Sequence, residues 1–369
     1  MKKLWQTGWR VSLCALLLLW IFHSIFVNEA RLAHPANEWA QLTRQAQWRL
    51  GWSEGPARLW QTLTLIQPGA FALSFVLMGC TVALGVMRWR MVLRVQGIDL
   101  PFSRAAEISL VAQFFNSFLL GSTGGDLMKA WYAARETHHK KTEAVVTVFV
   151  DRLVGLWAML LFAGVMMIPN FRPMFLEGFG PTKVSGPAGL VILGMLAGCT
   201  VVGFLAFRGG VSKRWSGARS WLRRLPKGAK LEQSLDSCRK FGREPFFLTR
   251  TLGLSMLLNV ICVLQWIVVG RGLGLTIATL PMFVTVPTVI CIAALPITPS
   301  GLGVRETLFV HMLDEFLKAG PALATAALSL SLLAYAGSLA WSLIGGVVYV
   351  TLKRKHHLSE AELDTPNGG

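Results

Sequence analysis

The chain has 369 residues, of which 53% are hydrophobic and only 15% are charged, and its mean hydropathy is +0.51. Several apolar runs approach the roughly 20 residues that cross a bilayer as a helix, so the composition excludes a water-soluble globular protein and predicts a polytopic membrane protein. The formal charge of +17 does not indicate a nucleic-acid partner, because the basic residues lie mostly between hydrophobic runs, which is the positive-inside pattern.

The predicted fold class is an all-α polytopic membrane protein with about six full spans. The expected spans are 9–27, 68–87, 143–168, 188–207, 249–270 and 322–350. We interpret the first as a retained span rather than a signal peptide, because it has no small-residue cleavage site and polar sequence follows it. A single integral membrane domain is expected over 1–358, followed by a disordered tail at 359–369.

Two connecting segments carry signals of their own. The loop 28–67 contains Trp39, Leu42, Ala46 and Leu50 at helical spacing, with further tryptophans nearby, which predicts an amphipathic segment anchored at the periplasmic or extracellular interface. The loop 208–248 is strongly basic and is expected to be cytoplasmic. Its charge is explained equally well by a solvated topology signal and by recognition of anionic lipid.

Two other segments, 103–138 and 277–318, begin as membrane helices and then break into glycine, proline and charge. Irregular backbone persists at membrane depth only where protein or a water-filled cavity surrounds it. If 103–138 were a full span, the basic loop 208–248 would lie outside the cell. We therefore expect 103–138 to be a re-entrant hairpin that enters and leaves on the cytoplasmic side, with both chain termini also cytoplasmic.

The same count of spans places both ends of 277–318 outside. We expect a second hairpin that enters from the opposite face, which gives the inverted arrangement of many secondary transporters. Two short spans, 277–296 and 302–320, satisfy the count as well and stay open as the alternative.

The first break holds the sharpest group of candidate site residues. Gly124 and Gly125 allow backbone amides to approach an anion, and a helix beginning near Asp126 would direct its positive end into the break. Lys129 would share a helical face with Asp126 and meet a lipid phosphate. The remaining candidates here are Asn116, Ser122 and Thr123, with Glu107 as a further cavity-lining residue. Simple helix capping explains Asp126 about as well.

Asp151 and Arg152 lie deep in the span 143–168. A charge at such depth costs about 2.5–3.5 kcal/mol on insertion scales, so each needs a partner or a cavity. Adjacent residues point about 100° apart on a helix and cannot pair well with one another. We expect Arg152 to face Asp126 or a lipid phosphate, and a structural ion pair that holds the hairpin is an equal alternative.

The second break is the counterpart of the first. Its candidate substrate-binding residues are Pro299, Ser300, Gly301, Gly303, Arg305 and Glu306. Proline stops a helix, glycine permits a tight reversal, and an arginine offers a two-pronged contact to phosphate. At the end of the second span, Arg88 and Trp89 are expected to anchor the helix at the interface.

No enzyme signature, nucleotide fingerprint or metal-ligand spacing occurs in the chain. The six cysteines are scattered and five of them lie in apolar runs, which fits small buried hydrophobic residues. We therefore expect no catalytic residue, no metal and no cofactor.

The ordered motifs resemble the lysylphosphatidylglycerol synthase transmembrane-region family, which is flippase-like and similar to the membrane half of bacterial multiple peptide resistance proteins. The motifs that carry the resemblance are Arg88 and Trp89, then Asn116 with Gly124, Gly125, Asp126 and Lys129, then Asp151, Arg152 and Gly155, and finally Pro299, Gly301, Gly303 and Glu306. The chain departs from the family pattern at Lys129, which is often arginine, and at Ser300, which is usually glycine.

The resemblance implies translocation of an anionic or aminoacylated lipid, a hopanoid-type lipid or a polyprenyl-linked sugar across a bacterial cytoplasmic (inner) membrane. No part of the 369 residues resembles the aminoacyltransferase domain, so synthesis of lysylphosphatidylglycerol is not expected. The alternatives are a membrane glycosyl- or phospho-transferase acting on a lipid-linked substrate, and a non-catalytic partner of an envelope-lipid synthesis complex. The expected partners are the lipid, a lipid-synthesis enzyme and a further copy of the chain, without nucleic acid.

Overall fold

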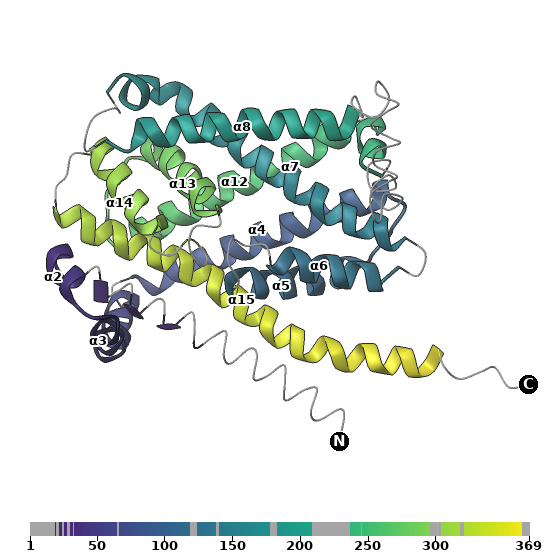
Figure 1. Ribbon diagram of the computed structural model, residues 1–369, viewed down its shortest axis with the longest axis horizontal. Helices are drawn as coiled ribbons and strands as arrows, with labels where there is room; N and C mark the ends of the chain where they lie inside the picture. The colour runs from purple at the N-terminus through teal and green to yellow at the C-terminus, as the bar shows by residue number, and fades with distance from the viewer. Residues whose placement is uncertain are drawn as a thin grey trace, which may run out of the picture.

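The computed structural model describes residues 19, 22–23, 26–27, 30–31, 33–64, 66–118, 124–137, 140–177, 183–208, 237–244, 246–295, 301, 304–317 and 321–363. Within these ranges the regular structure is entirely helical (Figure 1). The expected disordered tail 359–369 begins inside a helix, because α15 (Pro321–Leu363) continues to Leu363 through good helix formers.

Among the described residues, five helices are long and apolar enough to cross a membrane. They are α4 (Pro68–Val95), α7 (Lys141–Met167), α8 (Ser185–Arg208), α12 (Phe247–Gly272) and α15. At 1.5 Å per residue, about 20 residues cover the hydrocarbon core. These helices coincide with five of the six expected spans, whereas most of the expected span 9–27 lies outside the described residues.

Four shorter helices form two pairs. The first pair is α5 (Phe102–Phe118) with α6 (Gly124–Arg135), and the second is α13 (Thr279–Ala293) with α14 (Val304–Leu317). Their 12 to 17 residues correspond to about 18–26 Å, less than the roughly 30 Å of a bilayer core. The two pairs occupy opposite ends of the bundle, with α13 and α14 on the left and α5 and α6 toward the right (Figure 1).

The same set of helix neighbours occurs in both halves of the chain. α5 contacts α4 and α6, and α6 contacts α7; likewise α13 contacts α12 and α14, and α14 contacts α15. α4 and α12 pack along one another, and two residues after the end of each lies a glycine with positive φ, Gly97 at 68° and Gly274 at 75°. Exchanging α4 with α12, α7 with α15 and one short pair with the other therefore preserves the contacts.

Each short pair is embedded in its own apolar cluster. Trp89 and Tyr132 belong to the cluster that joins α4, α5, α6 and α15. Trp266 and Phe309, whose ring centroids lie 4.8 Å apart, belong to the cluster around α12, α13, α14, α7 and α15. Each short pair is therefore packed among longer helices along its described residues.

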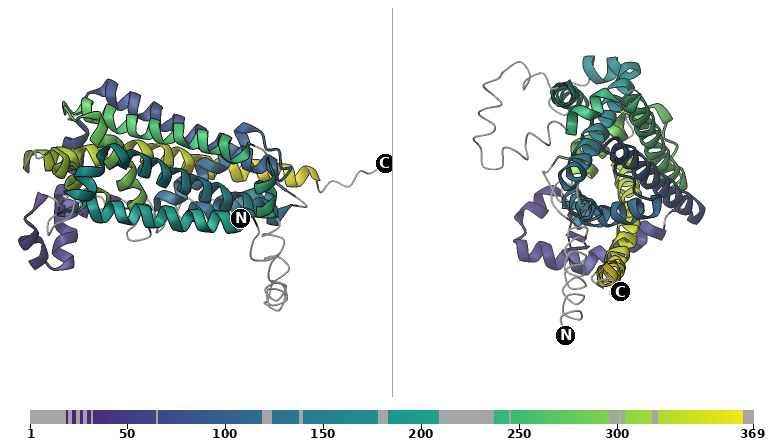
Figure 2. Two further views of the ribbon diagram at one scale, coloured as in Figure 1. Left: turned by 90° about the horizontal axis from the view of Figure 1, so that it is seen from above. Right: turned by 90° about the vertical axis from the view of Figure 1, so that its right-hand side faces the viewer.

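The segment before α4 forms α2 (Ala36–Gln41) and α3 (Arg44–Thr64), which lie at the end of the bundle nearest α14 (Figures 1 and 2). Trp48, Trp52 and Trp60 are exposed there, while Trp39 is buried. Figure 2 shows the C-terminal end of α15 at the other end of the long helices. Interfacial anchoring by this segment stays a prediction.

Candidate functional site

A buried ion cluster lies inside the first half of the bundle and is centred on Asp151 of α7. Its side chain is only 8% exposed. One carboxylate oxygen accepts a hydrogen bond from Arg88 Nε at 2.8 Å and the other accepts one from Lys129 Nζ at 3.0 Å. Arg88 Nη1 also donates to Ser255 Oγ of α12 at 3.0 Å. The cluster thus ties together α4, α6, α7 and α12.

Arg88 and Trp89 therefore do not form the expected interfacial anchor. Trp89 is fully buried, and the Lys129 ammonium lies 4.3 Å from the centroid of its ring, within the range of a cation–π contact. The indole N–H of Trp89 donates to Thr147 Oγ1 at 3.4 Å. Both residues face inward because α4 continues past the apolar stretch and packs against α7 and α12.

A second ion pair beside this cluster is half exposed. Arg152 Nε lies 3.4 Å from Asp126 Oδ2, and the side chains are 46% and 28% exposed. The structure therefore brings Arg152 to one of the two partners that were expected for it. These neighbouring ion pairs bring together two carboxylates and three cations. The carboxylates are those of Asp126 and Asp151, and the cations are Arg88, Lys129 and Arg152. The group carries one excess positive charge, which favours an anionic ligand.

The beginning of α6 is fixed against α5 by Asn116 and Gly125. Asn116 Oδ1 accepts a hydrogen bond from the Gly125 N–H at 2.9 Å. A Cβ atom on Gly125 would lie 1.9 Å from the Ala112 carbonyl oxygen, so only glycine permits this approach. The Gly125 amide is thus engaged within the protein rather than offered to an anion. Ser122 and Thr123 lie outside the described residues.

Replacing Gly125 with alanine should displace α6 from α5. We expect a loss of about 1–3 kcal/mol in the free energy of unfolding, typical of overpacking, measured by denaturant titration in mixed micelles. Gly85→Ala on α4 is the matched control, because a Cβ there meets nothing within 4 Å; it should leave stability unchanged or raise it. Equal stability of the two variants would contradict the close approach of α5 and α6.

Arg305 and Glu306 begin α14 and form a second buried cluster. Arg305 is 7% exposed and Glu306 is fully buried. The Arg305 guanidinium contacts Glu306, donates from Nε to Ser331 Oγ at 3.2 Å, and lies 4.3 Å from the ring centroid of Tyr335. Gly301 has a φ of +70° and lies against Ala293, where a Cβ would approach to 2.8 Å. Pro299, Ser300 and Gly303 lie outside the described residues.

One face of α15 links the second cluster to α5 of the first short helix pair. Ser331, Tyr335, Ser338 and Ser342 follow each other at spacings of three or four residues and share this face. Gln113 Nε2 donates to Ser338 Oγ at 3.2 Å, and Ser117 and Ser342 hydroxyls lie 2.5 Å apart. The polar side of α15 therefore runs from Arg305 to α5. Sequence reasoning missed this row, although its spacing within an apolar span was a usable signal.

A related polar contact crosses the middle of the bundle. Gln265 Nε2 of α12 donates to Ser74 Oγ of α4 at 2.9 Å and to the Ala334 carbonyl oxygen at 3.2 Å. It is the counterpart, under the exchange of α4 and α12, of the bond from Arg88 to Ser255. Glu107, another expected cavity residue, instead pairs with Arg104, which also binds Glu136 at the end of α6.

Within the described ranges, no group of three or more His, Cys, Asp or Glu side chains is placed to hold a metal ion.

Comparison with known families gives a match over most of the chain. The family model described as "Lysylphosphatidylglycerol synthase TM region" matches residues 46–341. The matched region includes both short helix pairs, both ion clusters and the polar face of α15 as far as Ser338. No curated protein matches the chain.

Proposed function

Because the chain belongs to the lysylphosphatidylglycerol synthase TM region family, we propose that this multi-pass membrane protein is a lipid translocase. Its substrate is an anionic phospholipid, an aminoacylated lipid or a lipid-linked sugar of the bacterial cytoplasmic membrane. The head group crosses along polar side chains between the two short helix pairs, while the acyl chains stay in the bilayer.

The observation that carries this proposal is the half-exposed Asp126–Arg152 pair beside the buried Asp151 cluster. Arg152 keeps nearly half of its side chain accessible, so a ligand can reach its guanidinium. A lipid phosphate can compete with Asp126 for the guanidinium, because a guanidinium binds phosphate through two parallel hydrogen bonds. The excess positive charge at this site favours that exchange.

Beyond this site, the proposed path runs along the polar face of α15 to the second cluster. The hydroxyls of Ser338 and Ser342 are already hydrogen-bonded to α5, and Arg305 lies further along the same helix face. In this proposal the head group passes from Arg152 toward Arg305 as these contacts exchange. The sequence contains no nucleotide-binding fingerprint, so we propose that the lipid gradient or an ion gradient drives transport.

We further propose that the two helix pairs are re-entrant hairpins that enter from opposite faces. Their short lengths and their positions at opposite ends of the bundle support this assignment (Figure 1). The alternative of two short spans, 277–296 and 302–320, is less favoured, because the 15 residues of α13 and the 14 of α14 each cover only about 21–23 Å, less than the hydrocarbon thickness. Hairpins allow each glycine break to reach the interior without exposing its backbone to lipid.

The double variant Asp126→Ala with Arg152→Ala tests the site. In proteoliposomes containing fluorescent phospholipids or a lipid-linked sugar, we expect the translocation rate to fall about tenfold, a change of about 1.4 kcal/mol in the barrier. The double variant should remain folded, because the pair is partly exposed and its net contribution to stability is about 0–1 kcal/mol.

Arg172→Ala with Glu177→Ala is the matched control, since that ion pair of 3.2 Å is exposed at the end of the bundle. It should keep the wild-type rate. Unchanged translocation by the Asp126 and Arg152 double variant would overturn the site. Metal-dependent product formation in detergent would instead identify a membrane transferase, and co-purification with a lipid synthase without lipid movement would identify a scaffold.

A further inference from the structure

Two threonines of α13 have buried hydroxyls without a hydrogen-bond partner, and they are called the α13 hydroxyl pair below. Thr285 and Thr288 are fully buried, and among the described residues no group forms a hydrogen bond with either side-chain oxygen. They lie three residues apart and therefore share one face of the helix. A hydroxyl that has left water without gaining a partner is unfavourable, so two of them on one helix face need a reason in function or in a ligand.

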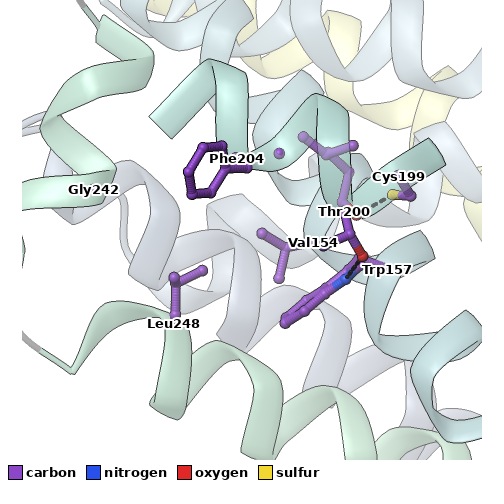
Figure 3. A pocket seen from close by; sticks show the side chains of 9 residues that line it. Val154, Trp157, Cys199, Thr200, Phe204, Gly242 and Leu248 are labelled. Carbon is purple, nitrogen blue, oxygen red and sulfur yellow. Dashed lines mark hydrogen bonds between the residues drawn. The ribbon is translucent and has the colours of Figure 1, made fainter. Parts of the chain in front are cut away.

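Three threonines of the long helices do find partners within the protein. Thr147 and Thr251 are also fully buried, yet each donates to a carbonyl oxygen of its own helix, at 2.6 and 2.8 Å respectively. Thr200 lies in the wall of an apolar pocket on the flank of the bundle and accepts a hydrogen bond from Trp157 Nε1 at 2.9 Å (Figure 3). Burial in an apolar helix therefore does not explain the unpartnered hydroxyls of α13.

The α13 hydroxyl pair lies close to the second ion cluster along the chain. α13 packs against α7, α8, α12 and α14 within the apolar cluster of the second half. Its last residue, Ala293, lies against Gly301 of the break that precedes Arg305. At 1.5 Å per residue, Thr288 and Thr285 lie about 8 and 12 Å back along α13 from this point. The two hydroxyls therefore extend the polar positions of the second cluster along α13.

This extension leads toward the end of the bundle that carries α2 and α3 (Figure 1). α12 ends beside the start of α4, where the Gln67 N–H donates to the Gly272 carbonyl oxygen at 3.0 Å, and α13 begins a few residues later. Thr285 is nearer to this end of α13 than Thr288. Because the basic loop 208–248 assigns the opposite end to the cytoplasm, the pair lies between the second cluster and the outer face.

A proline separates the two threonines. Pro287 has no N–H, so the Phe283 carbonyl oxygen receives no helical hydrogen bond from the residue four positions later. Sharp bends in helices occur almost always at such positions. Bending of α13 at Pro287 changes the surroundings of both hydroxyls and gives them a route from burial to contact with a ligand.

We propose, on the basis of the function proposed above, that Thr285 and Thr288 donate hydrogen bonds to the phosphate of the transported lipid as it passes from the Arg305 cluster to the outer leaflet. Hydrogen bonds to a charged phosphate oxygen are strong, and neither hydroxyl gives up a bond within the protein to form one. A phosphate fits this position better than a cation, because the Glu306 carboxylate is already paired with the Arg305 guanidinium.

The structure then represents one state of the transport cycle. Arg152 is 46% exposed, whereas the α13 hydroxyl pair is fully buried. The path is thus accessible at the first ion cluster and closed at the α13 hydroxyl pair. Release to the outer leaflet requires α13 to move, and Pro287 is the position at which it bends.

The double variant Thr285→Val with Thr288→Val tests this proposal, because valine keeps the shape of threonine and removes the hydroxyl. The assay uses vesicles with the purified protein and either fluorescent phosphatidylglycerol or a fluorescent lipid-linked sugar. For whichever lipid the wild type moves, the rate should fall about tenfold. The unfolding temperature should equal or exceed that of the wild type, since no hydrogen bond within the protein is lost. Thr285→Ser with Thr288→Ser keeps both hydroxyls and should retain most of the rate.

Thr251→Val is the matched control on α12. Its hydroxyl is equally buried but donates to the Phe247 carbonyl oxygen, so this variant should have a lower unfolding temperature and a wild-type rate when folded. A wild-type rate in the double valine variant would overturn the role of the α13 hydroxyl pair and leave the proposed function standing. A lower unfolding temperature of that variant would overturn it too, because the hydroxyls would then have partners within the protein. A wild-type protein that moves neither lipid would overturn the proposed function and this step with it.

Discussion

Replacing Asp151 with alanine is expected to cost about 3–5 kcal/mol in the free energy of unfolding, because removing one partner of a buried ion cluster leaves uncompensated charge behind. Arg88 and Lys129 would both lose their carboxylate, and Arg88 is 13% exposed while Lys129 is 11% exposed. The measurement is denaturant titration of the purified protein in mixed micelles. Asp151→Asn should be destabilised as well, because it keeps the shape but removes the charge.

Two controls separate this effect from a general sensitivity to substitution. Arg172→Ala removes an exposed ion pair and should change stability by less than about 1 kcal/mol. The triple variant Arg88→Met, Lys129→Met and Asp151→Leu removes all three charges and should be more stable than Asp151→Ala, because apolar replacements avoid the buried charge. A triple variant less stable than Asp151→Ala would contradict the assignment of Asp151 as the common partner of both cations.

Replacing Arg305 with alanine should have an effect of the same size, about 3–5 kcal/mol. The fully buried Glu306 would lose its neighbouring cation, and Tyr335 would lose the guanidinium that lies over its ring. Arg305→Lys should be intermediate, since lysine keeps the charge but not the planar guanidinium. Thermal unfolding of the variants in one detergent measures the order.

Matched variants at the surface test whether burial is the cause. Arg58→Ala breaks the pair with Glu54, which lies on α3 and is about a third exposed, and it should leave the unfolding temperature almost unchanged. Arg305→Ala with a wild-type unfolding temperature would show that Glu306 is stabilised without its neighbouring cation.

The positions of the long helices were predictable because lipid requires about 20 apolar residues for each span. The predicted span 249–270 falls inside Phe247–Gly272, and 143–168 nearly coincides with Lys141–Met167. The span 68–87 was predicted too short, because the hydropathy falls at Arg88 while the helix continues to Val95. The turns of α4 that the prediction left out begin at Arg88, whose charge is stabilised in the protein interior by its pairing with Asp151.

The contacts of the candidate site were likewise predictable only in part. Sequence indicated a local partner for Arg152, since Asp126 and the depth of α7 are both visible in the chain. It could not indicate that Arg88 reaches Asp151 and Ser255, because those contacts join residues 63 and 167 positions apart. Nor could it indicate that Asn116 binds the Gly125 amide, which depends on how closely α5 and α6 approach.

The most direct measurement of the proposed function is the rate at which the purified protein moves lipid between the leaflets of vesicles that contain no other protein. Leaflet-selective quenching of a fluorescent anionic phospholipid, or of a lipid-linked sugar, reports this rate. A lipid translocase should raise the rate for at least one of these lipids, and the Asp126→Ala and Arg152→Ala double variant should lower it while remaining folded. Rates equal to those of protein-free vesicles for every lipid class would contradict the proposed function.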